Sequence, residues 1–552
     1  MRPLIRVVTS AESAALDSST INAGVPSRAL MQRAGAAAAS EMGLRFRDRL
    51  ESGVLILAGP GNNGGDAWVI ARALNGVGAR VRIIEPVAAA TPDARAERAL
   101  TIEVLGDGAI VSLEQASVGG ESVVVDGLLG TGSTGAPRGE IAKAIAACAS
   151  ARRRGATVVA VDVPSGLDAS TGETLGEFAG ADLTLTFGSI KRGHLVNREA
   201  CGSIVVLDIG LTGTAAWPIG RDAGTAVMQS RPPGSPAHRL PELVDEAWVA
   251  AQLPPIAWDA HKGTRKKLAI IGGARGMAGA SVLAARSALR SGVGMVKLVV
   301  ASESVQPVQE AEPQALCAAW PADDDALHRD VLSWADALVI GPGLGLGPDS
   351  EALLHRVLDA WKGPTLIDAD AITHLAKRRE ELFQTLSGRP TLVTPHVFEF
   401  ARLSGAEPAD ILANRFEIGA DLAKHTGATI LLKGVPTVIT SPAGDRLVSA
   451  AGTPVLATGG SGDVLSGIAG TLFAQIGDPL CAGAAAAWVH GRAAERASVT
   501  GDGVVRGLSL DDVVRELRAS WHFDTRPARY PVLTELSLSG PRVHPSTRPP
   551  GR

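Results

Sequence analysis

The stretch Thr458-Gly459-Gly460-Ser461-Gly462-Asp463-Val464-Leu465-Ser466-Gly467 joins a glycine-rich loop to an apolar helix. Its glycines disfavour a regular element, whereas Val464, Leu465 and Ile468 recur at helical spacing. Such a loop at a helix N-terminus offers unpaired N–H groups and the positive end of the helix dipole, which suit a phosphate or developing negative charge. Asp463 would serve there as a base, or it would only cap a tight turn. The rest of the chain has to decide between these two interpretations.

Length and composition narrow the class of protein. At 552 residues the chain is too long for one ordinary core, so we expect at least two domains. The hydrophobic share of 45% and the charged share of 20% are typical of a globular protein. A net charge of −4 argues against general binding to nucleic acid or to membranes. Four scattered cysteines, no signal-peptide core and no long apolar run predict a cytoplasmic protein without a membrane span.

The first half of the chain contains a strand, a glycine loop and a helix in succession. Residues 54–57 form an apolar run, and the loop 58–66 (Ala-Gly-Pro-Gly-Asn-Asn-Gly-Gly-Asp) leads to a helix with Ala67, Ile70 and Leu74 on one face. This order is typical of a nucleotide or phosphate site in an open parallel sheet, although the loop lacks the dinucleotide pattern Gly-x-Gly-x-x-Gly. We therefore expect the loop to bind a ligand.

Two further apolar strands end in a carboxylate. Residues 123–125 precede Asp126, and residues 158–161 precede Asp162, each followed by a glycine-containing loop. Either aspartate alone could cap a turn, but three such loops should gather at the carboxyl edge of one sheet, where α/β folds bind ligands. Oxygen-bearing side chains there could hold a hard cation or a phosphate, and the sequence does not choose the metal. Lys191, farther along, would contact ligand phosphate or solvent.

The periodic pattern stops between about residues 211 and 244, in a segment rich in Gly, Pro, Thr and Ser. We therefore predict a first domain over residues 1–215, a linker over 216–245 and a second domain over 246–530. Residues 531–552 are predicted to be a disordered tail, because the end of the chain is rich in Pro, Arg and Ser.

The second domain repeats the strand-and-loop pattern. Apolar runs at residues 268–271, 337–340 and 365–367 each end at a loop with chemistry-capable residues, which predicts a second, independent α/β sheet. His396 closes another apolar strand, where a ligand should lie, although a capping or core role is the alternative.

The two halves resemble two known families. Residues of about 1 to 215 resemble the NAD(P)H-hydrate epimerases through the motifs at 59–66, 126–132 and 162–168. Residues of about 250 to 525 resemble the nucleotide-dependent NAD(P)H-hydrate dehydratases through the motifs at 341–345, 368–371, 394–396, 433–437 and 459–463. The resemblance implies a Rossmann-like three-layer domain followed by a ribokinase-like α/β domain. It also implies epimerisation of hydrated NADH or NADPH, then dehydration of the S form at the expense of ADP or ATP.

The resemblance also implies roles for individual residues. In the first domain the hydrate would contact Asn62, Asn63, Gly64, Gly65, Asp66, Gly130, Thr131, Gly132, Ser133, Thr134, Gly135, Ala136 and Asp162. A potassium ion would be held there by Asn63, Asp126 and Ser165. In the second domain the hydrate would contact Ala280, Gly343, His396 and Asp463, with Asp463 as the catalytic base. The nucleotide, accompanied by Mg²⁺, would contact Lys433, Gly434, Val435, Pro436, Thr437 and Gly462.

The second half departs from the family pattern in three places. Lys266 stands where the dehydratases usually have the last glycine of Lys-Gly-x-x-Gly, and Ala278 lies in a loop that lacks the usual proline. Val397-Phe398 replace Pro-Gly after His396, with Glu399 kept. These departures affect the opening loop and the shape of the pocket, whereas the proposed base and the nucleotide motif are intact.

Two alternatives remain open from sequence. A ribokinase-like small-molecule kinase fused to a ligand-binding domain would use Asp463 for the same deprotonation, and the first domain could bind its ligand without catalysis. We expect small-molecule substrates, no nucleic-acid or membrane partner, and a homo-oligomer. The acid/base groups of the epimerase are not assigned.

Overall fold

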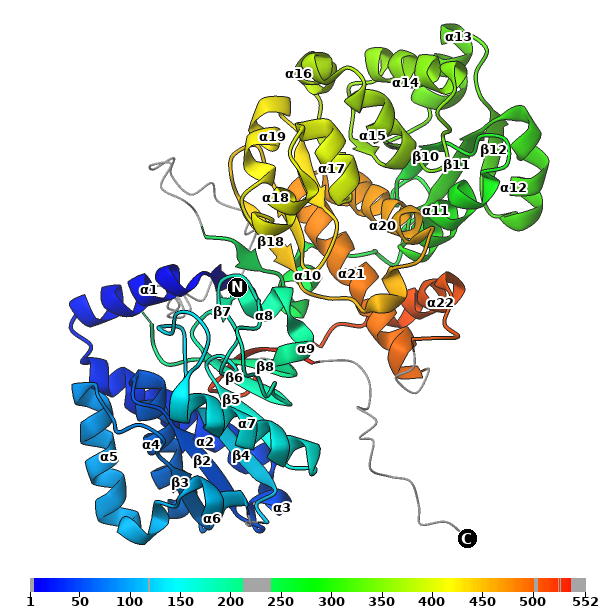
Figure 1. Cartoon of the computed structure of the whole chain (residues 1–552). Helices are drawn as coiled ribbons and strands as arrows, with labels where there is room; N and C mark the ends of the chain where they lie inside the picture. Colours follow the sequence, from blue (N-terminus) through cyan, green and yellow to red (C-terminus); the bar gives the residue numbers. More distant parts are fainter. Residues whose placement is uncertain are drawn as a thin grey trace. The chain divides into compact units, whose positions relative to one another are not determined.

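The computed structural model describes residues 4–117, 120–211, 240–500, 505–524, 526 and 528–537. These residues form two compact units (Figure 1). The first comprises the described residues up to 211 together with 526–537, and the second comprises residues 240–524. Each unit has its own mainly parallel sheet with helices, so the predicted α/β class is confirmed for both halves. No described helix is long and apolar enough to cross a bilayer.

The first unit is built on a seven-stranded sheet. In spatial order its strands are β19 (Val532–Leu536), β8 (Ser203–Leu207), β6 (Leu183–Phe187), β5 (Thr157–Val161), β4 (Val123–Gly127), β2 (Val54–Ala58) and β3 (Val81–Ile84). All neighbours are parallel except β19, which pairs with β8 in the antiparallel sense. Two short strands, β1 (Ile5–Val8) and β7 (Ile190–Lys191), form a separate parallel pair.

Helices cover both faces of this sheet. They are α1 (Ser10–Asn22), α2 (Ser27–Arg45), α3 (Arg47–Leu50), α4 (Asn62–Gly76), α5 (Pro92–Leu105), α6 (Leu113–Ser117), α7 (Gly139–Arg153), α8 (Arg192–Val196) and α9 (Arg198–Cys201). Because alternate strand residues face opposite ways, Ile56 packs with Trp68 of α4, whereas Leu55 packs with Ile145 of α7. The predicted three-layer arrangement is therefore confirmed.

The second unit contains a longer sheet. In spatial order its strands are β12 (Leu316–Ala319), β11 (Met295–Val300), β10 (Lys267–Ile271), β13 (Ala337–Ile340), β14 (Thr365–Ile367), β15 (Thr391–Val393), β16 (Thr429–Leu432), β17 (Thr437–Thr440), β18 (Arg446–Ser449) and β9 (Glu242–Leu243). The strands from β12 to β16 are parallel, β16 to β18 run antiparallel, and β9 is parallel to β18.

One helix lies at the centre of the second unit. Its α-helices are α10 (Glu246–Gln252), α11 (Ala278–Arg290), α12 (Val305–Ala311), α13 (Asp324–Leu327), α14 (Pro348–Ala360), α15 (Ala369–Ala376), α16 (Leu382–Leu386), α17 (Val397–Ser404), α18 (Pro408–Ala413), α19 (Gly419–Thr426), α20 (Ser461–Ile476), α21 (Pro479–Thr500) and α22 (Leu510–Ser520). Helix α20 packs against α11, α21 and β13, which explains why it is apolar nearly all round (Figure 1). Its N-terminus is thereby held in a fixed place.

In each sheet there is one strand whose next two partners along the chain are added on opposite sides of it. In the first unit β2 is followed by β3 on one side and β4 on the other, and in the second unit β10 is followed by β11 on one side and β13 on the other. Loops that leave neighbouring strands in opposite directions open a crevice at the carboxyl ends of those strands, where α/β folds bind ligands. The fold therefore predicts one site in each unit.

The chain differs from the predicted domain limits at two places. Most of the predicted linker, 216–245, falls outside the described residues, but Glu242–Leu243 forms β9. The predicted tail of residues 531–552 includes β19, and residues 526 and 528–530 belong to the first unit rather than the second. Strand β19 covers the edge of β8, and its Glu535 binds Arg45 at 2.7 Å, so this part of the tail prediction is wrong. Residues 538–552 lie outside the described part of the chain.

Candidate active sites

The first site is built around the start of α4. The sequence predicts a loop as far as Asp66. In the structure the helix already begins at Asn62, so the residues from Asn62 to Asp66 form its first turn. A Cβ on Gly64 would overlap the carbonyl oxygen of Gly59, which explains why only glycine fits there. The close approach presents the helix N-terminus to the crevice beside β2 and β4.

A cluster of buried oxygen atoms lies below this turn. The hydroxyl of Ser165 donates to Asp126 Oδ1 at 2.6 Å, and the Ser165 amide donates to Asp126 Oδ2 at 2.8 Å. Asn63 Nδ2 donates to the Leu129 carbonyl at 3.0 Å, which keeps Asn63 beside the same loop. Asp126 and Ser165 are almost fully buried. The fold thus brings together all three residues predicted to hold a cation.

No basic side chain is among the groups that change the pKa of Asp126. Burial raises the pKa of Asp126 above its ordinary value, and the hydrogen bonds from Ser165 and Leu128 offset this only partly. The surrounding donors are one carboxylate and neutral amide and hydroxyl oxygens, a set that suits a hard cation of low charge. A cation there would supply the charge that this buried carboxylate needs.

A cavity of about 540 Å³ opens above α4. Of the residues predicted to contact the hydrate, those that line it are Asn62, Asn63, Asp66, Gly130, Thr131, Gly132, Ser133 and Asp162. Gly64 and Gly65 are buried beneath it, whereas Thr134, Gly135 and Ala136 are exposed and do not line it. The cavity also has an apolar side, formed by Leu30, Met31 and Phe187 among others. It is therefore large enough and mixed enough in polarity for an organic ligand.

Lys191 is fully buried at this cavity, so the expectation that it might face solvent is wrong. Its ammonium group donates to Asp162 Oδ1 at 2.5 Å and to Thr186 Oγ1 at 2.8 Å. Burial raises the pKa of Asp162, but the charge and hydrogen bond of Lys191, with smaller contributions from His194 and Thr186, together bring it below its ordinary value. Asp162 has a left-handed backbone, with φ of 62°, which is costly for a residue other than glycine and is typical of functional positions.

Two more carboxyl groups line the same cavity, Asp66 from α4 and Asp17 from α1. Burial raises the pKa of Asp66 well above its ordinary value, and the negative charges of Asp162 and Asp17 raise it further. Burial likewise raises the pKa of Asp17. Asp17 could not be found from sequence, because nothing in an alanine-rich helix marks a residue whose partners lie far along the chain.

The second site lies at the start of α20. Gly460 precedes the helix with a left-handed φ of 93°, and Asp463 lies in the first turn without capping it, which favours the catalytic interpretation over the simple turn. Burial raises the pKa of Asp463 to about 7, the charge of Asp368 adds to this, and Lys433 acts against it. Asp463 is therefore able to exchange a proton near neutral pH.

Lys433 contacts two carboxylates of this site. Its ammonium group donates to Asp368 Oδ1 at 2.8 Å and lies 3.6 Å from Glu399 Oε2. Asp368 also accepts from the Ser466 hydroxyl of α20 at 2.6 Å. Burial raises the pKa of Asp368, but the charge and hydrogen bond of Lys433, with the hydrogen bonds from Ser466 and Thr394, together hold it below its ordinary value. The sequence did not identify this arrangement, because the three groups come from separate strands and a helix.

The predicted nucleotide residues meet at Lys433. Residues 433–437 turn between β16 and β17, where the Thr437 hydroxyl donates to the Gly434 carbonyl at 3.1 Å. Val435 is exposed in this turn. A Cβ on Gly462 would lie 3.4 Å from Lys433 Nζ, so the turn and the α20 loop face each other. The carbonyl of Pro436 accepts a hydrogen bond from Arg415 at 2.8 Å, which stabilises the turn.

The predicted hydrate residues of the second unit come from two places. Ala280 of α11 and Gly343 lie together, since a Cβ on Gly343 would approach the Ala280 Cβ to 3.0 Å. The Ala274 amide donates to the Gly343 carbonyl at 2.7 Å, and Asp370 accepts from the Gly345 amide at 2.8 Å, which fixes the loop after β13.

His396 caps α17. Its Nδ1 accepts from the amides of Phe398 and Glu399, and the Glu399 carboxylate accepts in return from the His396 amide at 2.8 Å. Burial and the charge of Lys433 lower the pKa of His396, so the ring is neutral with its proton on Nε2. The capping alternative is thus correct in structure, while 46% of the side chain stays exposed and available to a ligand.

The residues that depart from the family pattern change the local side chains but leave the surrounding backbone structure formed. Lys266 adopts a left-handed φ of 73°, the conformation that a glycine would adopt without strain. Ala278 begins α11. Phe398, which replaces the usual glycine, is 61% exposed and lies edge-on to His396 with ring centres 6.0 Å apart. The surface beside His396 is therefore more apolar than a glycine would make it.

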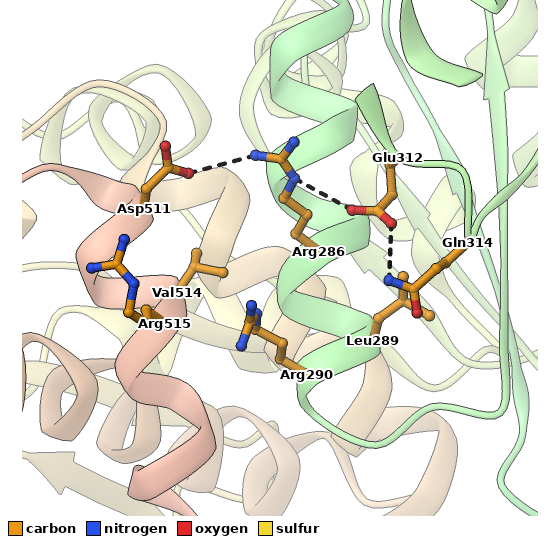
Figure 2. A pocket seen from close by; sticks show the side chains of 8 residues that line it. All are labelled: Arg286, Leu289, Arg290, Glu312, Gln314, Asp511, Val514 and Arg515. Atoms are coloured by element: carbon orange, nitrogen blue, oxygen red, sulfur yellow. Dashed lines mark hydrogen bonds and ion pairs between the residues drawn. The ribbon is translucent and has the colours of Figure 1, made fainter. Parts of the chain in front are cut away.

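A further hollow of about 420 Å³ lies between α11 and α22 (Figure 2). Arg286 lies 3.3 Å from Glu312 and 3.5 Å from Asp511, and Gln314 donates to Glu312 at 3.5 Å. These charges largely neutralise one another. None of the predicted site residues lines this hollow, so we do not assign it to catalysis.

Family comparisons match both units. Residues 268–514 match the NAD(P)H-hydrate dehydratase model, which confirms the ribokinase-like assignment, and residues 27–193 match the model of the YjeF-related protein N-terminus. The bifunctional NAD(P)H-hydrate repair enzyme Nnr of Salinibacter ruber is 35% identical over 526 residues, covering 90% of this chain and 93% of the relative. That of Moorella thermoacetica is 33% identical over 516 residues, covering 89% and 92%.

Among solved structures, an ADP/ATP-dependent NAD(P)H-hydrate dehydratase from Bacillus subtilis, co-crystallised with ATP/Mg²⁺, is 28% identical. It covers 50% of this chain and 96% of its own, with a TM-score of 0.45. The two family models and the near full-length relatives agree in the order of the units. The chain therefore belongs to the family of bifunctional NAD(P)H-hydrate repair enzymes.

Proposed function

We propose that the two units repair hydrated NADH and NADPH in consecutive steps. The first unit interconverts the R and S hydrates, and the second converts the S hydrate to the reduced cofactor with ADP or ATP as phosphate donor. The observation that carries the second step is Asp463, with a pKa of about 7, in the first turn of α20 beside Lys433. A carboxylate and a helix N-terminus together suit the transfer of a phosphoryl group to a hydroxyl.

The dehydration follows from that geometry. Asp463 removes the proton of the ring hydroxyl, whose oxygen attacks the terminal phosphorus of the nucleotide and displaces the shortened nucleotide. The amides at the start of α20 stabilise the charge that develops on the transferred group. Phosphate is then a good leaving group, which the lone pair of the adjacent ring nitrogen expels, and loss of a proton from the next carbon restores the ring double bond.

Residues around Asp463 bind and orient the two substrates. Lys433 to Thr437 and Gly462 hold the nucleotide, and Mg²⁺ bound to its phosphates would neutralise part of their charge. Ala280, Gly343 and His396 contact the hydrate. The exposed Nε2–H of His396 is a hydrogen-bond donor in the neutral state of the ring.

The first unit holds the hydrate in the cavity above α4. Asn62, Asp66, the loop residues 130–133 and Asp162 contact it. Asn63, Asp126 and Ser165 would hold a potassium ion beside the helix N-terminus. What supports the ion is the buried Asp126 carboxylate, which has neutral oxygen neighbours. Exchange of K⁺ for Li⁺ or Na⁺ should slow epimerisation, and Asp126→Asn should remove the response to K⁺ while dehydration continues.

One assay separates this function from the kinase alternative. Full-length protein given S hydrate and ADP or ATP should release free phosphate and restore the absorbance of the reduced nicotinamide. A stable phosphorylated product with no return of absorbance would instead establish a small-molecule kinase. The comparison of ADP with ATP in the same assay gives the nucleotide preference. Cytoplasmic location and a homo-oligomeric state stay predictions from the sequence.

A further inference from the structure

The cavity of the first unit holds three carboxyl groups and one ammonium group. Asp66 comes from the first turn of α4, Asp17 from α1, Asp162 from the end of β5, and Lys191 from β7. Lys191 is bound to Asp162, so one carboxylate has a partner. Within the described residues, neither Asp66 nor Asp17 makes a side-chain ion pair or hydrogen bond, and both are half-buried in the cavity wall.

The environments of Asp66 and Asp162 therefore differ although both face one cavity. The charge and hydrogen bond of Lys191 help to lower the pKa of Asp162, whereas burial and two negative neighbours raise the pKa of Asp66. Two carboxyl groups whose environments shift their pKa values in opposite directions are typical of an acid and a base in one active site. Nothing in the sequence distinguishes the two aspartates in this way.

We propose that Asp66 and Asp162 are the acid–base pair of the epimerase site, with Asp66 as proton donor and Asp162, positioned by Lys191, as proton acceptor. This inference rests on the proposed epimerisation in the first unit. It adds Lys191 as a positioning residue and Asp17 as a group that tunes Asp66 without touching the reacting atoms.

The chemistry needs one acid and one base and no other reagent. The carbon that bears the hydroxyl is bonded to the ring nitrogen. Asp162 removes the hydroxyl proton, the carbon–oxygen bond becomes a carbonyl, and the carbon–nitrogen bond breaks with its electron pair passing to nitrogen. Asp66 gives its proton to that nitrogen. After the aldehyde rotates, the same steps in reverse close the ring on the other face and return both protons.

The other charged groups near α4 are engaged elsewhere. Arg28 of α2 and Arg72 of α4 both bind Glu97 of α5, and Arg98 binds Glu85. Asp126 of β4 is held by Ser165. His194 of α8 lies near Asp162, and burial lowers its pKa to about 3, so it is neutral. The charges that set the titration of Asp66 are therefore those of Asp162, Asp17 and Lys191.

The test uses the full-length protein with pure S hydrate and no nucleotide, and follows the appearance of R hydrate by chromatography. Asp66→Asn and Asp162→Asn should each lower kcat for epimerisation by at least about 100-fold with KM changed by less than about threefold, since acid–base groups contribute 10²–10⁴-fold. Dehydration of S hydrate with nucleotide, measured in the same samples, reports that the second unit is folded, and the thermal midpoint of the first unit, measured by calorimetry, reports that the first unit is folded.

A pH profile distinguishes proton transfer from mere contact. Wild-type epimerisation should fall as pH rises through the pKa of Asp66 and fall as pH drops through that of Asp162. Asp17→Asn removes a negative neighbour of Asp66, so the alkaline limb should move to lower pH. Lys191→Met should move the acidic limb to higher pH, because Asp162 loses the charge that keeps it ionised.

Each outcome decides one point. An inactive wild-type protein would contradict the proposed epimerase function itself. An active wild-type protein with Asp66→Asn or Asp162→Asn near the wild-type rate would overturn the acid–base pair. An alkaline limb that stays in place in Asp17→Asn would overturn Asp66 as the donor.

Discussion

The two sites place the same three groups in different surroundings. In each, a buried lysine binds one aspartate, Lys191 with Asp162 and Lys433 with Asp368. In each, burial and the charge of that aspartate raise the pKa of a second one, Asp66 or Asp463. An aspartate next to a lysine–aspartate pair is thus a way to raise the pKa of a carboxyl group in a protein interior.

What differs is the structure around the second aspartate. Asp463 lies in a first turn preceded by Gly459-Gly460 and faces a turn suited to phosphate, whereas the first turn that carries Asp66 faces a cavity with a cation-type cluster below it. The first site has what a reversible proton exchange requires, and the second adds what phosphoryl transfer requires. The comparison teaches that the aspartate–lysine frame sets proton chemistry, while the neighbouring backbone sets the reaction.

The strongest test of this separation is Asp463→Asn. Loss of the base should lower dehydration about 10³-fold, because deprotonation of the hydroxyl then has no acceptor. Epimerisation should be unchanged within a factor of about two, since Asp463 belongs to the second unit only. A folded variant that loses both activities equally would contradict two separate sites.

Removal of the C-terminal strand should affect the first unit alone. A chain ending at residue 524 loses β19, which leaves the edge of β8 uncovered and Arg45 and Glu41 without Glu535 and Arg529. We expect a loss of roughly 2–3 kcal/mol in the first unit, which lowers its thermal midpoint by about 5–10 °C. Calorimetry with and without a dehydratase ligand assigns the transition to a unit.

The control for this truncation is a chain ending at residue 537, which keeps β19 and should unfold as the full chain does. A first-unit midpoint that is equal in both truncated proteins would show that β19 adds nothing to the sheet.

Asp368→Asn sharpens the comparison through pH. Wild-type dehydration, measured as kcat/KM, should fall tenfold per unit as pH drops below about 7, because Asp463 must be ionised to act. Without the charge of Asp368 the pKa of Asp463 falls, so this limb should move to lower pH. Activity at the optimum should drop by roughly tenfold because Lys433 loses its closest partner.

Ser466→Ala is the matched control, since it removes one hydrogen bond to Asp368 and no charge. Its limb should move far less than that of Asp368→Asn. Limbs that coincide in Asp368→Asn and the wild type would show that Asp368 does not set the pKa of Asp463.

The smallest expected effect concerns Lys266. Its left-handed backbone strains a lysine but not a glycine, so Lys266→Gly should stabilise the second unit by about 1 kcal/mol or leave it unchanged where chain entropy cancels the gain. Lys266→Ala keeps the strain and removes only the side chain. A Lys266→Gly protein less stable than Lys266→Ala would show that the backbone strain is not relieved by glycine.

Much of the fold could be predicted from sequence. Apolar runs such as 123–125 and 158–161 lie at the centre of a parallel sheet, and glycine loops follow strands in both units. Strand ends gather at one edge, which is why Asp126, Asp162 and Asn63 could be grouped without a structure. The start of α4 was placed five residues too late, because Gly64 and Gly65 disfavour helix in isolation and are required here by close packing.

The missed features depend on tertiary contacts. Lys191 is polar in sequence and buried in the fold only because Asp162 and Thr186 satisfy it. The strand β19 is short, and it is stabilised by pairing with the edge strand β8, which lies more than 300 residues earlier in the sequence. Asp17 gains its role from the groups around it. Such features become visible only when distant segments meet.

The central claim is that two separate sites act in sequence, and one measurement tests it directly. Pure R hydrate is incubated with nucleotide, K⁺ and Mg²⁺, together with Asp66→Asn, with Asp463→Asn, or with an equal mixture of the two proteins, and reduced cofactor is followed by its absorbance. The account predicts almost no reduced cofactor with either variant alone and near wild-type conversion with the mixture, because S hydrate made by one protein diffuses to the other. A mixture that stays as inactive as the single variants, although each keeps its other activity, would contradict it.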